Sequence, residues 1–425
     1  MPLGTGKDRV YRWIAGRTPD GPTQRLIAEL LGIAGEAVPR FPWPHWLALD
    51  PLQQPPDHPW DASGAIRALE DVPWRDTMEQ LHRRHFVQLT GGALTTSLWT
   101  WLTADPAAAG QLAHGKRLGA AAVGHIEDRV RRLRRADDED GGGQVLTETA
   151  LSLRMTIQLL KDRTYTNAHG ARLHAAAADL TRMHAWAAFD IHGTCDDATF
   201  QAALQATHAA SDPVLGSHVL AFWSIAASSV DRAADAETMT TAALAAARGR
   251  TTPRVEAMLL SRRARARAKQ HDPLAYTDLD RSADLVDATG QEADPEWVYW
   301  FDQAEHLGAL ASTHLDLGHP DRAERAFTEG AALFPADRVR TQALFLARRA
   351  DAQWSQGEID GACSTAGQAL DLTETISSHR SVGTLNGLAR RMGSHKTLPA
   401  VRDFRDRLTA ALPPATSSDG IASSS

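Results

Sequence analysis

Residues 314–335 read HLDLGHPDRAERAFTEGAALFP, and no other segment is as informative about the fold. It contains a glycine turn at Gly318 and a stop signal at Pro335, with helix-forming residues on either side of the turn. Ala323 and Phe327 lie four residues apart, so both face the same side of the second helix. A flexible turn residue followed by a small residue is typical of two closely packed helices.

The same pattern recurs from about residue 145 to 410. Turn-like positions appear roughly every 40 residues, at Gly193, Asp231, His271, Gly318 and Gly357. Four of them are followed five residues later by an alanine: Ala198, Ala236, Ala323 and Ala362. This rhythm predicts stacked helix–turn–helix pairs.

The quoted stretch resembles the second half of a tetratricopeptide repeat, while the other units are degenerate and longer than the standard repeat. The chain has 74 alanines, the best helix former. We therefore predict an all-α fold, with a partial helix-turn-helix followed by a right-handed α-solenoid of tetratricopeptide-like helix pairs. An unrelated helical bundle is the alternative.

Composition narrows the function classes. The net charge is −7, which argues against a surface that is basic throughout, and Arg outnumbers Lys 40 to 5. The two cysteines, Cys195 and Cys363, exclude a disulfide framework and suit a cytoplasmic protein. The sequence contains no run of 18 apolar residues, so it predicts no membrane-spanning helix. No nucleotide-binding, hydrolase or metal motif occurs, so we expect no enzyme, no cofactor and no metal.

Residues 1–40 contain a basic unit. Within it, residues 4–16, GTGKDRVYRWIAG, resemble the turn and recognition helix of a Cro/repressor-type helix-turn-helix. In that arrangement Val10 and Trp13 are buried, and the polar residues around them face the DNA. The expected DNA contacts are Lys7, Asp8, Arg9, Tyr11, Arg12 and Arg17. The alternative is that these charges form the solvated face of an ordinary helix.

A support helix is expected over Thr23–Leu31, with Leu26, Ile27, Leu30 and Leu31 buried. The complete domain of this family has an additional helix and a half before the turn, whereas only three residues precede Gly4. We therefore expect residues 1–40, as they stand, to bind an operator weakly.

The chain divides into five expected segments. These are the partial helix-turn-helix (1–40), a Pro/Trp-rich linker (41–75), a helical connector (76–140), the repeat domain (141–412) and a disordered tail (413–425). The linker tryptophans Trp43, Trp46 and Trp60 are expected to dock on neighbouring helices.

As a whole, the chain is similar to a family of actinobacterial, chiefly streptomycete, regulators. The resemblance is carried by the runs 12–13, 24–32, 43–47, 83–86, 128–135, 186–190 and 297–302. It implies a cytoplasmic transcriptional regulator whose helical domain senses a ligand or a partner.

Residues 294–305, DPEWVYWFDQAE, are the densest aromatic cluster. On a helix its aromatic residues would share one face, beside carboxylates, and could line a groove for a peptide or a cationic ligand. The candidate contacts are Trp297, Tyr299, Trp300, Asp302 and Glu305. Core packing between repeats is the favoured alternative.

Two basic runs, 129–135 and 262–269, are interpreted as solvated helix faces whose charges pair with neighbouring acidic residues. Neither run has the interleaved aromatic residues of a single-strand-binding surface.

Two functions remain open. The first is a DNA-binding transcriptional regulator, a homodimer on double-stranded DNA, with a small-molecule, peptide or protein effector in the repeat groove. The second is a repeat scaffold that binds a protein or peptide and no DNA.

Overall fold

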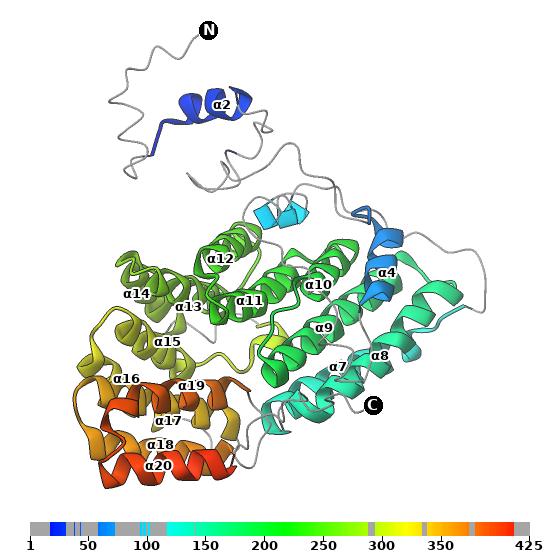
Figure 1. Ribbon diagram of the computed structural model, residues 1–425. Coiled ribbons are helices and arrows are strands. Elements are labelled where there is room, and N and C mark those ends of the chain that lie inside the picture. Colours follow the sequence, from blue (N-terminus) through cyan, green and yellow to red (C-terminus); the bar gives the residue numbers. More distant parts are fainter. Residues whose placement is uncertain are drawn as a thin grey trace, which may run out of the picture.

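The computed structural model is built from helices (Figure 1). It describes residues 18–30, 38, 43, 58–72, 94–95, 97–98, 101–102, 117–140, 142–287, 294–333, 338–373 and 379–411. Within these residues there is no β-strand, only an isolated bridge between Arg117 and Thr164. The all-α prediction is confirmed.

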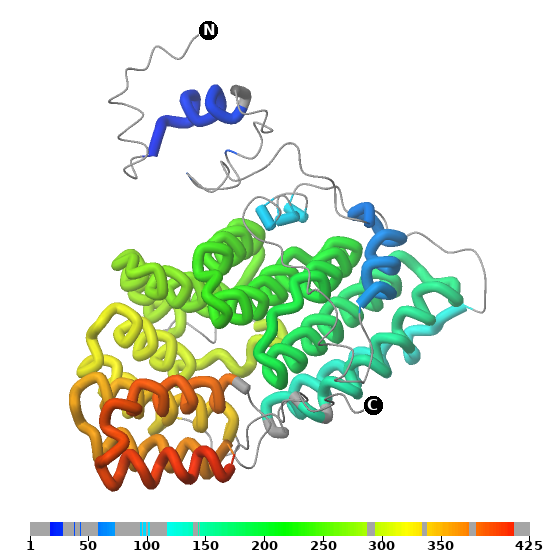
Figure 2. The backbone as a smooth tube through the Cα atoms, viewed as in Figure 1, coloured from blue at the N-terminus to red at the C-terminus, as the bar shows by residue number. Residues whose placement is uncertain are grey.

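From α8 to α14 the helices follow one another along the chain with short turns between them (Figure 2). The first described helices are α2 (Gly21–Leu30), α4 (Ala62–Asp71), α7 (Ala120–Asp140) and α8 (Gly142–Asp162). The next six are α9 (Asn167–His192), α10 (Asp197–Ala209), α11 (Pro213–Ser229), α12 (Ala233–Ala247), α13 (Pro253–Lys269) and α14 (Leu274–Asp287). The last six are α15 (Gln303–Asp316), α16 (Pro320–Ala331), α17 (Val339–Ser355), α18 (Ile359–Thr373), α19 (His379–Arg391) and α20 (Pro399–Ala411). The 3₁₀ turns η2 (Glu296–Val298) and η3 (Met392–His395) precede α15 and follow α19.

From α9 onward the helices pack in consecutive pairs, α9 with α10, α11 with α12, and so on to α17 with α18. The first helices of successive pairs also contact one another, α9 with α11, α11 with α13 and α13 with α15. The helices α9, α11, α13, α15, α17 and α19 are called the inner helices below. This stacking is the solenoid-like arrangement that the sequence rhythm predicts.

All five predicted turn positions have a left-handed backbone. The φ angles are 71° at Gly193, 62° at Asp231, 57° at His271, 80° at Gly318 and 82° at Gly357. A right-handed helix cannot continue through such a residue, so each marks a helix end. The sequence missed two further turns of this kind, Ser211 and Gly249.

The predicted small contacts are confirmed at three positions and wrong at one. Ala236, Ala323 and Ala362 are completely buried. Ala198 is exposed. Its turn is longer, because α10 begins only at Asp197, so Ala198 lies in the first turn of that helix on its solvent side.

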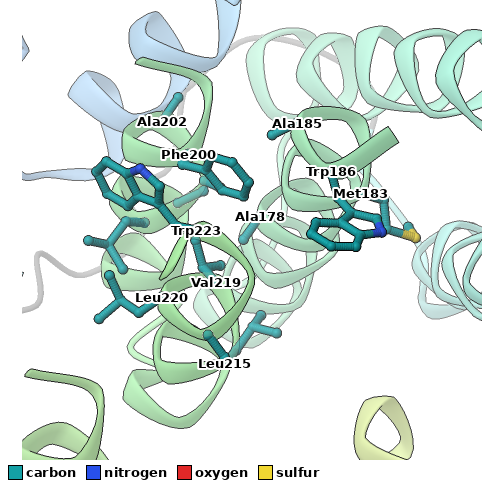
Figure 3. Close-up of a cluster of buried hydrophobic side chains, with 14 of the residues drawn as sticks. Ala178, Met183, Ala185, Trp186, Phe200, Ala202, Leu215, Val219, Leu220 and Trp223 are labelled. Atoms are coloured by element: carbon teal, nitrogen blue, oxygen red, sulfur yellow. The ribbon is translucent and has the colours of Figure 1, made fainter. Parts of the chain in front are cut away.

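The main core extends from α4 to α13, and Figure 3 shows the part of it that α9, α10 and α11 form. Phe200 and Trp223 stack with their rings 7° from parallel and 5.8 Å between centroids. Trp186 of α9 extends this core toward α11, where its ring packs edge to face on Phe222 with 4.9 Å between the ring centroids. A second cluster joins α17, α18 and α20.

A helix is confirmed at the position of the expected support helix, while the partial helix-turn-helix itself stays a prediction. Helix α2 covers most of the expected support helix and starts two residues earlier, after Asp20, whose carboxylate accepts a hydrogen bond from the Thr23 amide. Leu26 and Ile27, expected to be buried, are only half-buried, because Ala28 occupies the buried side of the helix. The side chains of Leu30 and Leu31 lie outside the described residues.

The expected linker contains a helix that the sequence did not reveal. Helix α4 begins after its N-cap residue Asp61, whose carboxylate accepts a hydrogen bond from the Gly64 amide at 2.7 Å. Trp60, just before it, packs edge-on against His208, and Trp43 packs against the main core, as expected. Trp46 lies outside the described residues. None of the described helices is both long enough and apolar enough to cross a membrane.

Candidate functional site

The inner helices surround a cavity of about 420 Å³. Each contributes to its wall, among others through Phe189, Ile225, Arg262, Ser312, Arg348 and Arg380. A second cavity of about 110 Å³ shares several of these residues and reaches toward Trp186, Phe222 and Trp300. The two together are called the inner cavity.

Helix α19 contacts α9, so the last inner helix meets the first one. The guanidinium of Arg380 lies 5.0 Å from the ring centroid of Trp186. The inner cavity is therefore bounded on this side by protein.

The second half of α13, residues 261–269 with the sequence SRRARARAK, divides its charges between two faces. Ala264, Ala266 and Ala268 are buried between them. Arg262, Arg265 and Lys269 recur at intervals of three and four residues and all line the inner cavity. The remaining arginines of the run project to the other side, toward α12 and α14.

On that other side every arginine has carboxylate partners. Arg263 donates to both oxygens of Asp278, at 2.9 and 2.6 Å. Arg267 donates to Asp278 at 2.9 Å and to Glu237 at 2.9 Å. These bonds fix α13 between its neighbours and determine which side of the helix faces the cavity.

Cavity-facing arginines have far fewer partners. Arg265 approaches Asp316 at 3.4 Å. Arg348 donates a hydrogen bond to the Ser312 hydroxyl at 3.0 Å. Arg262 lies over the Trp300 ring, 5.1 Å from its centroid.

Burial and the closeness of several guanidinium groups shift the pKa values of the cavity-facing side chains. Burial, together with neighbouring arginines, lowers the pKa of Arg262 to about 10 despite the nearby Glu305. Burial and the other guanidinium groups also lower the pKa of Arg348 and Arg380. In the opposite sense, burial raises the pKa of Glu305, although Arg262 opposes it. The inner cavity thus holds positive charge that the protein neutralises incompletely.

An acidic cluster at one end of the inner cavity is well compensated. Arg340 of α17 pairs with Asp137 of α7 at 3.1 Å and with Asp190 of α9 at 3.5 Å. Burial alone would lower the pKa of Arg340, but these carboxylates raise it above its ordinary value. The cluster joins α7 to the inner helices α9 and α17.

The aromatic candidates do not lie on a helix, contrary to the prediction. Residues 296–298 form η2, and α15 begins only after Asp302, whose carboxylate accepts a hydrogen bond from the Glu305 amide at 3.1 Å. From the sequence alone, one helix over residues 294–305 could not be distinguished from a short 3₁₀ helix followed by a capping residue, Asp302. Of the five candidates, Trp300 and Glu305 line the inner cavity.

The other three candidates have structural contacts. Trp297 is buried and stacks on His218, with 4.1 Å between ring centroids. The Tyr299 hydroxyl donates to a carboxylate oxygen of Asp138. Asp302 caps α15 and pairs with Arg338 at 3.0 Å. For Trp297 the favoured alternative, core packing, describes its position.

The predicted DNA contacts Lys7, Asp8, Arg9, Tyr11, Arg12 and Arg17 lie outside the described residues. They remain a prediction from the sequence.

The sequence interpretation missed the arginines of the inner cavity. The prediction that residues 262–269 form a solvated face is wrong, because the side chain of Arg265 is only 16% exposed. The predicted pairing with neighbouring acidic residues is confirmed for Arg263 and Arg267. The available signal was the alternation of arginine and alanine: alanine between charges indicates close helix packing on a helix that has little solvent-facing surface.

Comparison with known proteins gave no family assignment. A scan against models of protein families produced no match, and neither did a search of curated proteins.

Proposed function

We propose that this chain is a DNA-binding transcriptional regulator whose helical repeats sense an effector. One observation carries the sensor part of the proposal: the inner helices, from α9 to α19, surround a single charged cavity although they are widely spaced along the chain. A molecule bound there would contact several repeats at once.

Such a site supports regulation, because an occupant changes the spacing of helices that are distant in sequence. The acidic cluster extends the connection, since Arg340 links the inner helix α17 to α7, the helix on the amino-terminal side of the repeats. An effector would shift the equilibrium between two arrangements only if it binds one of them more tightly.

The DNA-binding part rests on the amino-terminal sequence. Arg9 and Arg12 stand on the expected recognition helix, where arginine can bond guanine through two nitrogens. Helix-turn-helix proteins read paired half-sites, so we expect the chain to act as a homodimer.

The test is a gel shift of the intact chain on its own promoter region, compared with the double variant Arg9→Ala/Arg12→Ala. We expect this variant to lose operator binding and keep its helical circular dichroism. A matched control, Arg325→Ala/Arg402→Ala, removes the same charge from exposed sites on α16 and α20 and should bind like the wild type. Equal affinity of all three proteins would remove Arg9 and Arg12 from recognition.

The inner cavity also supports the alternative function, a repeat scaffold that binds a protein or peptide. That function requires no DNA binding. A well-folded chain that shifts no promoter fragment, together with capture of a defined peptide in the cavity, would favour the scaffold.

A further inference from the structure

Positive charge exceeds negative charge on the wall of the larger part of the inner cavity. The wall carries six basic side chains: Arg262, Arg265, Lys269, Arg348, Arg380 and Arg391. It carries two carboxylates, Asp316 and Asp351, and both already have an arginine partner, Arg265 and Arg391. In the part of the chain that the structure describes, no carboxylate lies within 4.0 Å of Arg262, Arg348 or Arg380.

Two arginine nitrogens on this wall have no hydrogen-bond acceptor among the described residues. Arg262 Nε and Arg265 Nη1 are buried and have no hydrogen-bond partner among the described residues. A buried guanidinium that lacks partners is costly, because it loses water and gains nothing in return. A fold that holds two such groups around one space, beside Arg348 and Arg380, is complementary to a negatively charged occupant.

We propose that the inner cavity binds a small molecule with at least two anionic oxygens, as in a phosphate or a carboxylate, held by Arg262, Arg265, Arg348 and Arg380. Planar guanidinium groups bond both classes through two parallel hydrogen bonds. This proposal rests on the proposed function, since it names the chemical class of the effector. The lowered pKa of the same arginines agrees with it, because an anion would restore their ordinary basicity.

An apolar or aromatic part of the ligand has a place beside the arginines. The smaller part of the cavity is lined by Trp186, Phe222 and Trp300, together with Ile225 and Leu344. Arg262 and Arg380 line both parts, so a molecule with its charge at these arginines can extend its apolar part onto the rings. The volume of about 420 Å³ lies in the range of small-molecule sites.

The test uses pyrophosphate and citrate as probes, each titrated into the full chain by calorimetry, with sodium chloride keeping the ionic strength constant. We expect at least one probe to bind and to raise Tm by several degrees. Binding of pyrophosphate alone would identify phosphate as the recognised group, and binding of citrate alone would identify carboxylate.

The double variant Arg348→Gln/Arg380→Gln should weaken that binding at least about tenfold. The control Arg325→Gln, an exposed arginine on α16, should leave it unchanged. Without any probe, Arg348→Gln should have a Tm equal to or above that of the wild type, because it removes uncompensated buried charge. A merely structural role for Arg348 predicts a lower Tm.

Three results would overturn the proposal: no heat and no Tm shift with either probe up to about 10 mM, equal binding by the wild type and the double variant, or binding of a glutamate-rich peptide but neither small anion. The outcome is separate from that of the gel shift. Anion binding without DNA binding would contradict the proposed regulator and support the anion site. DNA binding without anion binding would support the regulator and contradict the anion site.

Discussion

Arg380 of α19 lies over the ring of Trp186 of α9, with 5.0 Å between the guanidinium carbon and the ring centroid. This contact joins the last inner helix to the first, although the two are far apart in the chain. Because α19 also contacts α17, the ring contact lies where three inner helices meet at the wall of the inner cavity.

We predict that Trp186→Leu increases amide hydrogen exchange in α19 several-fold more than Trp186→Phe does. The phenylalanine keeps an aromatic face for Arg380, and the leucine does not, so the difference isolates a cation–π contribution of about 1 kcal/mol. Amides of α20 serve as an internal control. Equal exchange in α19 for the two variants would mean that the ring contact contributes nothing to closure.

Asp179 is buried between two arginines, Arg134 of α7 at 2.5 Å and Arg182 of α9 at 2.7 Å. Burial alone would raise the pKa of Asp179, but the two guanidinium groups lower it well below its usual range. Asp179→Asn leaves two arginines without a counter-charge and should lower the free energy of unfolding by about 3 kcal/mol.

Urea denaturation measures that loss. The matched control is Asp321→Asn, which breaks an exposed pair with Arg325 and should leave the free energy of unfolding nearly unchanged. A loss below about 1 kcal/mol for Asp179→Asn would show that α7 and α9 do not depend on this ion pair.

His174 of α9 is completely buried, and neither ring nitrogen has a hydrogen-bond partner among the described residues. Burial lowers its pKa from 6.5 to about 4. Below pH 6.5 the unfolded chain takes up a proton at this histidine and the folded chain does not. The protein should therefore lose stability as the pH falls from 6.5 to 4, by about 3 kcal/mol from this group.

His174→Leu removes the titrating group, so its stability should decline less over that range than that of the wild type. The control is His125→Gln, at an exposed position of α7, which should follow the wild-type profile. Identical pH profiles for all three proteins would show that His174 is protonated equally well in the folded state.

The left-handed backbone at Gly357 and His271 predicts that one substitution lowers the stability of the protein and that another does not. Gly357→Ala places a side chain at φ 82° and should destabilise the protein by about 1 kcal/mol. His271→Gly relieves the strain of a non-glycine residue at φ 57° and should be neutral or stabilising by up to about 1 kcal/mol. Thermal denaturation of both variants checks this. A stabilised Gly357→Ala variant would contradict the assigned backbone.

Local patterns predicted the helix pairs well, because a turn residue and a small contact residue are both fixed within one repeat. Gly318 and Ala323 illustrate this, since each is required by its own backbone or its nearest neighbour. Helix α4 was missed because prolines surround a helix of only ten residues.

The inner cavity could not be predicted in the same way. Whether an arginine of α13 faces water, a carboxylate or a cavity depends on α9, α17 and α19, which are distant in sequence. Arg263 and Arg262 are adjacent, yet the first binds Asp278 and the second lies over Trp300. One helix pattern therefore contains both a structural ion pair and a candidate ligand contact.

The most direct test of the proposed regulator is the affinity of the intact chain for fluorescently labelled promoter DNA, measured by anisotropy at physiological salt. A scrambled fragment of the same length and composition is the reference. We predict binding to the promoter at least about tenfold tighter than to the scrambled DNA, as specific arginine–guanine contacts of a weakly binding unit would give. Equal affinity for the two fragments would contradict the proposal that this chain is a sequence-specific DNA-binding regulator.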